Sequence, residues 1–317
     1  MDWIDTYWHE TFYKGSIVKE FVIDISKASY VNKNAKKCAV DLVKEIVAKY
    51  PPPYYLMVSG GVDSQALLQS WIEAEQPFIA YCAVFPNDLN YHDIKTLEQF
   101  KTVYNINVKY LPFDITDFLE NQLVEYAIKY QCNSPHIMSQ AKISEMFMDG
   151  TVISSGMPIF KHTTAIQQNF TYSTFGLQRY KELANRNFIP YFLCHTKEIV
   201  GAWQHSCKSL KRITSENIAK LNQIQYMNGT NDSNIENNSY SLKCEIYRDN
   251  EFKIIPQESK LHGFEKLKEL YDSKKHLISD AMKRYPGKDY YRVFDVLFRY
   301  PLEQQIPYTN ASRLKVD

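Results

Sequence analysis

The fold prediction starts from YYLMVSGGVDSQALLQSW, residues 54–71, in which two glycines, an acid and a serine separate two apolar stretches. Prolines precede YYLMV and glycines follow it, which predicts a short strand covered on both faces, as in a parallel sheet. Beyond the turn, apolar side chains from Leu67 to Ile72 recur at helical spacing. SGGVDS is therefore predicted to join a buried strand to the N-terminus of a helix.

The turn itself has the composition of an anion site. Gly60 and Gly61 let a ligand approach the backbone closely, and the first amides of a helix have no carbonyl partner within it. Phosphate is the natural occupant of such a turn. Asp63 would repel phosphate unless a divalent cation such as Mg2+ bridges the two, and Ser59 and Ser64 add hydroxyl donors. The patterns GxxxxGK[ST] and GxGxxG of other phosphate-binding turns do not fit here.

Strand and helix patterns alternate after this turn. The alternation predicts an α/β fold with a doubly wound parallel sheet, in which ligands lie beyond the carboxyl ends of the strands. A second serine and glycine, Ser155 and Gly156, end the strand pattern TVISSG and should lie at that same edge. The predicted strands are 78–85, 108–114 and 151–156, and the predicted helices are 91–105, 115–130 and 134–149.

The flanking regions have other patterns. Residues 1–30 fit a short hairpin or an extended arm, and 34–50 is predicted to form a helix that ends at three prolines. The stretch 228–239 predicts an exposed loop, and KCEIYRDNEFKIIP, 243–256, predicts a hairpin around Asp249 and Asn250. We expect three regions: an N-terminal arm and helix at 1–50, an α/β core at 51–160, and a mainly helical region at 161–317 that would close over a ligand bound at the core.

Composition narrows the class of protein. The 317 residues carry 37 basic and 36 acidic side chains, so the net charge of +1 does not favour nucleic acid as a partner. Six cysteines include no CxxC pair or zinc-type cluster, and we expect reduced, mostly buried thiols. The sequence has no signal pattern and no apolar run long enough for a membrane span. We therefore expect a soluble cytoplasmic protein that does not enter a membrane.

The hexapeptide from Ser59 to Ser64 resembles the PP-loop, SGGxDS, of the N-type ATP pyrophosphatases. That resemblance implies an adenine nucleotide alpha hydrolase-like (HUP-type) fold and cleavage of ATP between its α and β phosphates. It also implies ATP and Mg2+ as cofactors and Asp63 as a catalytic metal ligand. The implied nucleotide-binding residues of this loop are Ser59, Gly60, Gly61, Val62, Asp63 and Ser64.

Within that superfamily the chain is most similar to the synthetase domain of asparagine synthetase. The spacing to Ser155 and Gly156 matches the family's second nucleotide-contacting turn, and IIPQESKLHGFEKL resembles the stretch that supplies a catalytic lysine, here Lys260. Glu258 replaces the arginine of that stretch, and no acidic pair follows Gly156. An ordinary surface lysine is the alternative for Lys260. The chain lacks the N-terminal glutaminase cysteine, so nitrogen would come from ammonia, an amine or a separate subunit.

The resemblance implies an enzyme that adenylates a carboxylate or amide-like oxygen of a small acceptor and couples it to a nitrogen nucleophile. One alternative is an enzyme that modifies tRNA or a nucleobase, because SGGVDSQALL is also similar to the loop of lysidine synthetases. A cyano-deazaguanine synthase is disfavoured because Cys244 has no neighbouring cysteines. The remaining alternative is a nucleotide-binding module that has lost catalysis, against which the retained Asp63 argues.

Overall fold

The computed structural model describes most of the predicted core and separate parts of the two flanking regions. Lys260 and the predicted loop at 228–239 lie outside the described residues, as does most of the region 161–317, so those predictions stay predictions. The described residues are 5–13, 16–24, 31–130, 132, 135–156, 177, 180–181, 183–206, 244–256, 267–283 and 296–299.

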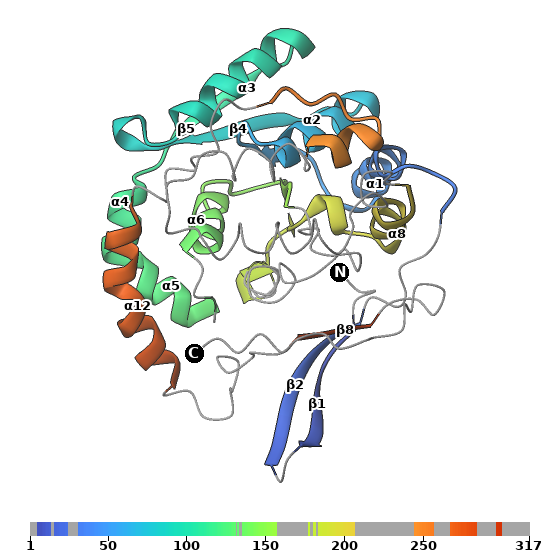
Figure 1. The fold of residues 1–317 in the computed structure, drawn as a ribbon. Helices are drawn as coiled ribbons and strands as arrows, with labels where there is room; N and C mark the ends of the chain where they lie inside the picture. Colours follow the sequence, from blue (N-terminus) through green and yellow to red (C-terminus); the bar gives the residue numbers. More distant parts are fainter. Residues whose placement is uncertain are drawn as a thin grey trace.

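A five-stranded sheet forms the centre of the molecule (Figure 1). Its strand order is β5-β4-β3-β6-β7, and every neighbouring pair is parallel. The first of these strands in the chain, β3, therefore lies in the middle. The chain adds β4 and β5 on one side of it and then β6 and β7 on the other. This confirms the predicted doubly wound α/β fold. The strands are β3 Tyr54–Met57, β4 Ile79–Val84, β5 Val108–Pro112, β6 Thr151–Ser154 and β7 Phe188–Ile189.

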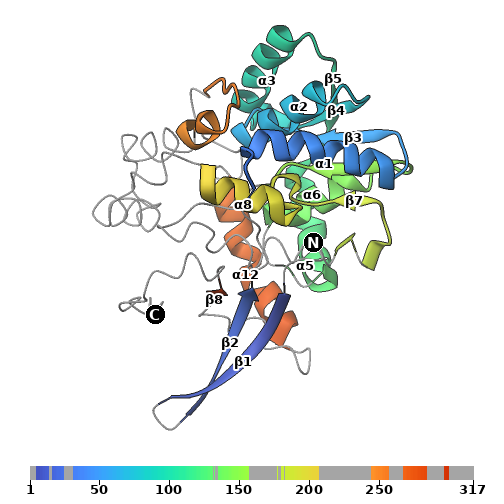
Figure 2. The same ribbon diagram turned by 90° about the vertical axis from the view of Figure 1, so that its right-hand side faces the viewer.

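Helices cover both faces of this sheet (Figures 1 and 2). One buried hydrophobic cluster takes side chains from α1 Ala35–Lys49, α2 Val62–Glu73, α3 Tyr91–Tyr104 and α8 Lys197–Ser206. A second cluster takes side chains from α5 Leu123–Tyr130, α6 Pro135–Ser144 and α12 Lys268–Lys283. The shorter helical turns are η1 Pro86–Asp88, α4 Ile115–Asp117, η2 Phe118–Gln122 and η3 Phe192–Cys194.

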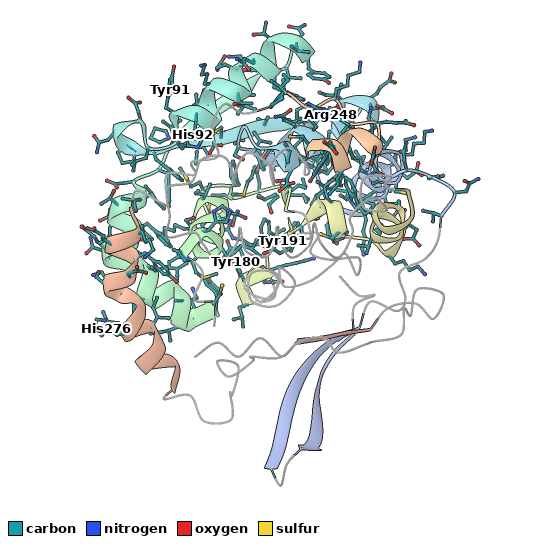
Figure 3. The ribbon with its side chains drawn as sticks, viewed as in Figure 1. Tyr91, His92, Tyr180, Tyr191, Arg248 and His276 are labelled. Atoms are coloured by element: carbon teal, nitrogen blue, oxygen red, sulfur yellow. The ribbon has the colours of Figure 1, made fainter. Side chains whose placement is uncertain are left out.

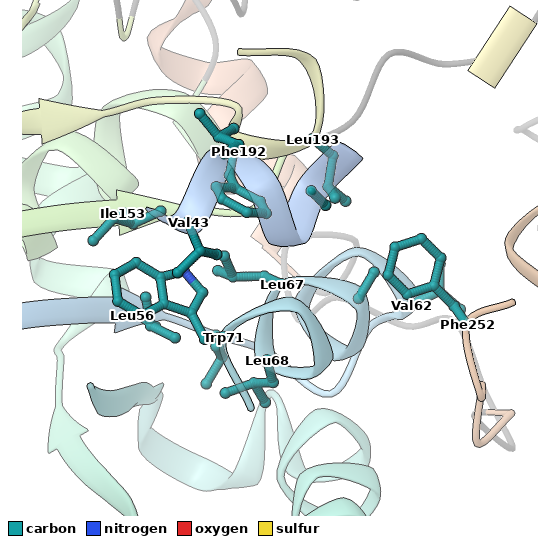
Figure 4. Close-up of a cluster of buried hydrophobic side chains, with 14 of the residues drawn as sticks. Val43, Leu56, Val62, Leu67, Leu68, Trp71, Ile153, Phe192, Leu193 and Phe252 are labelled. Atoms are coloured by element: carbon teal, nitrogen blue, oxygen red, sulfur yellow. The ribbon is translucent and has the colours of Figure 1, made fainter. Parts of the chain in front are cut away.

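Helix α2, which begins at the SGGVDS turn, is packed into the first cluster. Leu67, Leu68 and Trp71 are fully buried, which confirms the helical spacing that the sequence shows. Figure 4 shows these side chains among Leu56 of β3 and its neighbours. Burial of a large apolar side chain stabilises a fold by roughly 1.5–3 kcal/mol relative to leaving it exposed. The turn is therefore anchored on a rigid element.

The N-terminal residues form the hairpin that the sequence allowed. Strand β1 Asp5–Tyr13 pairs antiparallel with β2 Ser16–Asp24, and β8 Val296–Arg299 adds to β2 in parallel. This hairpin extends away from the five-stranded sheet in both views (Figures 1 and 2).

Residues 244–256, here called the strap, do not form the predicted hairpin. Residues 244–249 are helical, and the helix ends where Glu251 adopts a left-handed φ of 67°. The amides of Phe252 and Glu251 bond to the carbonyls of Tyr247 and Arg248, at 3.1 and 2.9 Å, which is the Schellman pattern of a helix end. Asp249 and Asn250 therefore lie at the end of a helix. These turn-forming residues, which predicted a hairpin, terminate a helix instead.

The five described cysteines are buried, which confirms that prediction for Cys38, Cys82, Cys132, Cys194 and Cys244. Within the described ranges, no helix combines the length and the hydropathy that crossing a bilayer would require.

Candidate functional site

The SGGVDS turn sits where the sequence predicts, between the end of β3 and the first turn of α2. Gly61 is the N-cap residue of that helix, and Asp63 lies in its first turn. The backbone amide of Ser59 donates to Ser64 Oγ at 2.9 Å, and the Gly61 amide donates to Ser59 Oγ at 3.3 Å. The two hydroxyls also lie 3.3 Å apart and share a hydrogen bond in which either can be the donor. The two serines thus hold the turn in shape, and one of their two hydroxyl protons remains for a ligand.

Gly60 is required by the packing of α3 against the turn. A Cβ atom on Gly60 would stand 2.2 Å from the backbone oxygen of Asp93 and 2.9 Å from Thr96 Cβ. At Gly61 the nearest atom would be Ser59 Oγ at 3.3 Å, which a side-chain rotation can relieve. Glycine therefore serves a different purpose at each position. Gly60 leaves room for the neighbouring helix α3, whereas Gly61 lies at the N-terminus of α2, where a ligand would approach.

The second turn, Ser155 and Gly156, is held by residues that follow β7. The Leu193 amide donates to the Ser155 carbonyl at 3.3 Å. Gly156 has a φ of 21°, and a Cβ atom there would stand 2.2 Å from Tyr191 Cδ1. Since β3 and β6 are neighbours in the sheet, both turns leave the same edge at the point where the strand order reverses. Ligands of doubly wound sheets bind at this point.

A cavity of about 500 Å³ opens at this edge. Both turns contribute to its lining, and so do β4, α3 and α6. Gly60 is absent from the lining because it faces α3. The predicted site residues that line the cavity are Ser59, Gly61, Val62, Asp63, Ser64, Ser155 and Gly156.

Ser154 is a lining residue that the sequence analysis missed. It is 4% exposed at the end of β6, and its Oγ has no hydrogen-bond partner among the described residues. A buried hydroxyl without a partner costs stability, and a bound ligand that pairs with it removes the cost. The only signal for Ser154 in the sequence is a polar residue at the end of TVIS, one position before Ser155.

Asp93, at the start of α3, is a second carboxylate in the lining and is 6% exposed. No sequence motif connects it with Asp63, because they belong to different helices. No group of three or more potential metal ligands occurs in the described part of the chain. Mg2+ commonly takes one or two protein carboxylates and completes its coordination with water and substrate phosphates. The donor set at this cavity fits a cation of that kind, held in part by Asp63.

Asp63 also accepts a hydrogen bond from a residue that no motif indicated. Tyr247 Oη in the strap donates to Asp63 Oδ1. The Tyr247 side chain is fully buried, and burial followed by the charge of Asp63 raises its pKa well above the usual value for a phenol. Tyr247 therefore stays protonated and remains a donor at physiological pH.

The rest of the cavity lining includes both polar and apolar side chains. His136 and Gln140 of α6 are polar lining residues, with their Nε2 atoms 2.7 Å apart. Tyr81, Cys82 and Leu111 also line the cavity. Burial raises the pKa of the Cys82 thiol to about 12, so it is a packing residue and a poor nucleophile. Figure 3 shows His92 and Tyr91 at the beginning of α3, above this region.

The sequence matches no protein-family model and no curated protein. Similar solved structures include NMN synthetase from Francisella tularensis, which is 14% identical, with a TM-score of 0.31. They also include an NH3-dependent NAD synthetase from Campylobacter jejuni in complex with nitrate, which is 12% identical, with a TM-score of 0.30. Each alignment covers 71% of this chain and 97% of the other chain. Identities and TM-scores as low as these carry no argument about function, which is inferred from the residues of the site.

Proposed function

We propose that this protein is an ATP pyrophosphatase of the ligase type, which adenylates an acceptor oxygen and then couples the acceptor to a nitrogen nucleophile. One observation supports this above the others: the SGGVDS turn caps α2 and lines the cavity at the edge where β3 and β6 diverge. The start of a helix suited to an anion, a carboxylate and apolar side chains suited to a base all line the cavity there. The cavity, at about 500 Å³, is within the usual size range of small-molecule sites.

In the proposed reaction, the acceptor oxygen attacks the α phosphorus of ATP, and the bond from that phosphorus to the α–β bridging oxygen breaks. Pyrophosphate leaves with the bonding electron pair and is held by the amides at the start of α2 and by the hydroxyls of Ser59 and Ser64. A nitrogen nucleophile then displaces AMP from the acceptor and loses a proton. Mg2+ bound through Asp63 would neutralise charge on the phosphates. The protein acts by positioning, without a covalent intermediate of its own.

We place the acceptor toward α6, where the amide of Gln140 uses one proton for His136 and has a second for a carboxylate or amide-like oxygen. Ammonia or an amine would supply the nitrogen, directly or from a separate subunit. The finer resemblance to asparagine synthetase depends partly on Lys260. If Lys260 acts on the phosphates in the transition state, Lys260→Ala will lower turnover more than ATP affinity. An unchanged turnover would make Lys260 an ordinary surface residue.

The test is to identify the products formed from ATP with Mg2+, with and without ammonium and a panel of free amino acids that carry carboxylates. AMP and pyrophosphate, stimulated by one acceptor, are the expected result. AMP and pyrophosphate without stimulation would retain the pyrophosphatase and direct the search to nucleobases and tRNA. ADP and phosphate would contradict the proposal, and ATP binding without turnover would favour a module that has lost catalysis.

A further inference from the structure

The strap is attached to α2 by two glutamine side chains. Gln69 Nε2 donates to the Lys253 carbonyl at 2.7 Å, and the Lys253 amide donates to Gln69 Oε1 at 2.9 Å. Gln65 makes the same pair of bonds with Ile255, both at 2.8 Å. The glutamines are one helical turn apart. They form hydrogen bonds with the backbone N–H and C=O groups of alternate strap residues, as a neighbouring strand would.

Gln65 also connects the strap with the nucleotide turn. Its Nε2 donates a second hydrogen bond to the Gly60 carbonyl at 3.0 Å, so both amide protons are used. Gln65 and Gln69 are both buried, and losing either partner would leave buried polar groups unsatisfied. The strap and the turn are therefore held as one unit.

The other end of the strap is anchored by Asn250 and by aromatic packing. Asn250 Oδ1 accepts from the Ala35 amide at the start of α1, at 2.9 Å. Tyr247 packs against Trp203 of α8 and against Phe252, with ring centroids 5.0 and 5.7 Å away. Arg248, labelled in Figure 3, marks the strap where it lies against these helices. This packing fixes the Tyr247 ring, and its hydroxyl reaches Asp63.

We propose that the strap positions the Asp63 carboxylate for the cation, with Tyr247 as the positioning residue. This inference rests on the proposed function, in which Asp63 is a cation ligand. An ionised carboxylate has about four acceptor positions, so a bond to Tyr247 leaves capacity for a cation. The bond restricts rotation of the carboxylate and therefore reduces the entropy that cation binding would cost. Removing such partners of a metal ligand typically weakens metal affinity or activity by about 10–100-fold.

The first experiment compares Tyr247→Phe with Tyr180→Phe. Tyr180 is also fully buried, and its hydroxyl accepts a hydrogen bond from Ser144 Oγ at 2.8 Å, in the second hydrophobic cluster. Binding of Mn2+ together with α,β-methylene-ATP is measured by electron paramagnetic resonance, which needs no turnover. We expect Tyr247→Phe to weaken Mn2+ binding by about 10-fold or more and Tyr180→Phe to leave it unchanged.

The second experiment loosens the strap without touching the turn or Asp63. Gln69→Leu removes the bonds to Lys253, whereas Gln76→Leu removes only a local bond to the Ala74 carbonyl at 3.2 Å. We expect Gln69→Leu to weaken Mn2+ binding, by less than Tyr247→Phe does, and Gln76→Leu to have no effect. Thermal unfolding in the absence of nucleotide shows whether each variant is folded.

The outcomes separate this inference from the proposed function. If the wild-type protein binds no Mn2+ with the nucleotide analogue, the proposed function is wrong and the positioning role falls with it. If the wild-type protein binds Mn2+ and folded Tyr247→Phe binds it equally well or more tightly, only the positioning role is wrong. Weaker binding in Tyr247→Phe and Gln69→Leu, with both controls unchanged, supports the inference.

Discussion

Met57 and Ser154 are register partners on the parallel strands β3 and β6, although β4 and β5 come between them in the chain. Parallel strands present their carboxyl ends at one edge, so the turns that follow these two residues open onto the same cavity. Two motifs that are distant in the sequence become the two sides of one site through this pairing.

Gly60→Ala should destabilise the protein much more than Gly61→Ala. The added methyl group at Gly60 would meet the backbone of Asp93, which cannot rotate away, and overpacking of this kind costs about 1–3 kcal/mol. At Gly61 the methyl group meets only the Ser59 side chain. Urea unfolding of the two variants measures the difference. Equal free energies of unfolding would show that α3 does not constrain the turn.

Asp63→Asn should abolish nearly all ATP cleavage and leave the fold intact. An asparagine oxygen can still accept the hydrogen bond from Tyr247, but it brings no negative charge to a cation. Pyrophosphate release measures the loss, and thermal unfolding serves as the control. A variant that cleaves ATP at the wild-type rate would remove Asp63 from the metal site.

Ser154→Ala should weaken ligand binding without lowering the stability of the ligand-free protein. The Ser154 hydroxyl is buried without a partner among the described residues, so its removal should leave the ligand-free protein equally stable or more stable. If the hydroxyl pairs with the nucleotide or the acceptor, the variant will gain less thermal stabilisation from α,β-methylene-ATP with Mg2+ or from the acceptor. Thermal shifts with and without these ligands test this. A loss of stability without ligand, with unchanged thermal shifts, would make Ser154 a packing residue.

Stability should fall at alkaline pH because of buried thiols. Burial raises the pKa of Cys82 to about 12 and that of Cys38 to about 11. Both thiols keep their protons in the folded protein above pH ~8.5, where unfolded chains begin to release theirs. Their contribution to the free energy of unfolding is therefore complete below pH ~8.5, and it declines as the pH rises toward 11 to 12.

The measurement is the free energy of urea unfolding between pH 7 and 10, for wild type and for Cys82→Ala. We expect a shallower decline with pH in the variant, because one titrating thiol is gone. Rapid reaction of Cys82 with a thiol reagent in the folded protein at pH 8 would contradict the burial on which this prediction depends.

Much of the core could be predicted because its signals are local. The apolar run at β3, the glycine turn and the helical spacing from Leu67 to Trp71 each lie within a few residues, and the structure confirms all three. The hairpin predicted around Asp249 and Asn250 was wrong because the same turn-forming residues also end helices. Only the partners of the segment, Gln65 and Gln69, decide that residues 253–255 pair with side chains of α2.

The sequence by itself determined the alternation of strands and helices, the turn that begins α2, and the presence of Asp63 in its first turn. Tertiary structure alone decided that β6 lies beside β3, that Ser154 and Asp93 line the same cavity, and that Tyr247 reaches Asp63. The physical reason is the range of the interactions. Hydrophobic periodicity and backbone capping act between near neighbours in the chain, whereas the contacts that complete this site join residues that meet only after the sheet and its helices have packed.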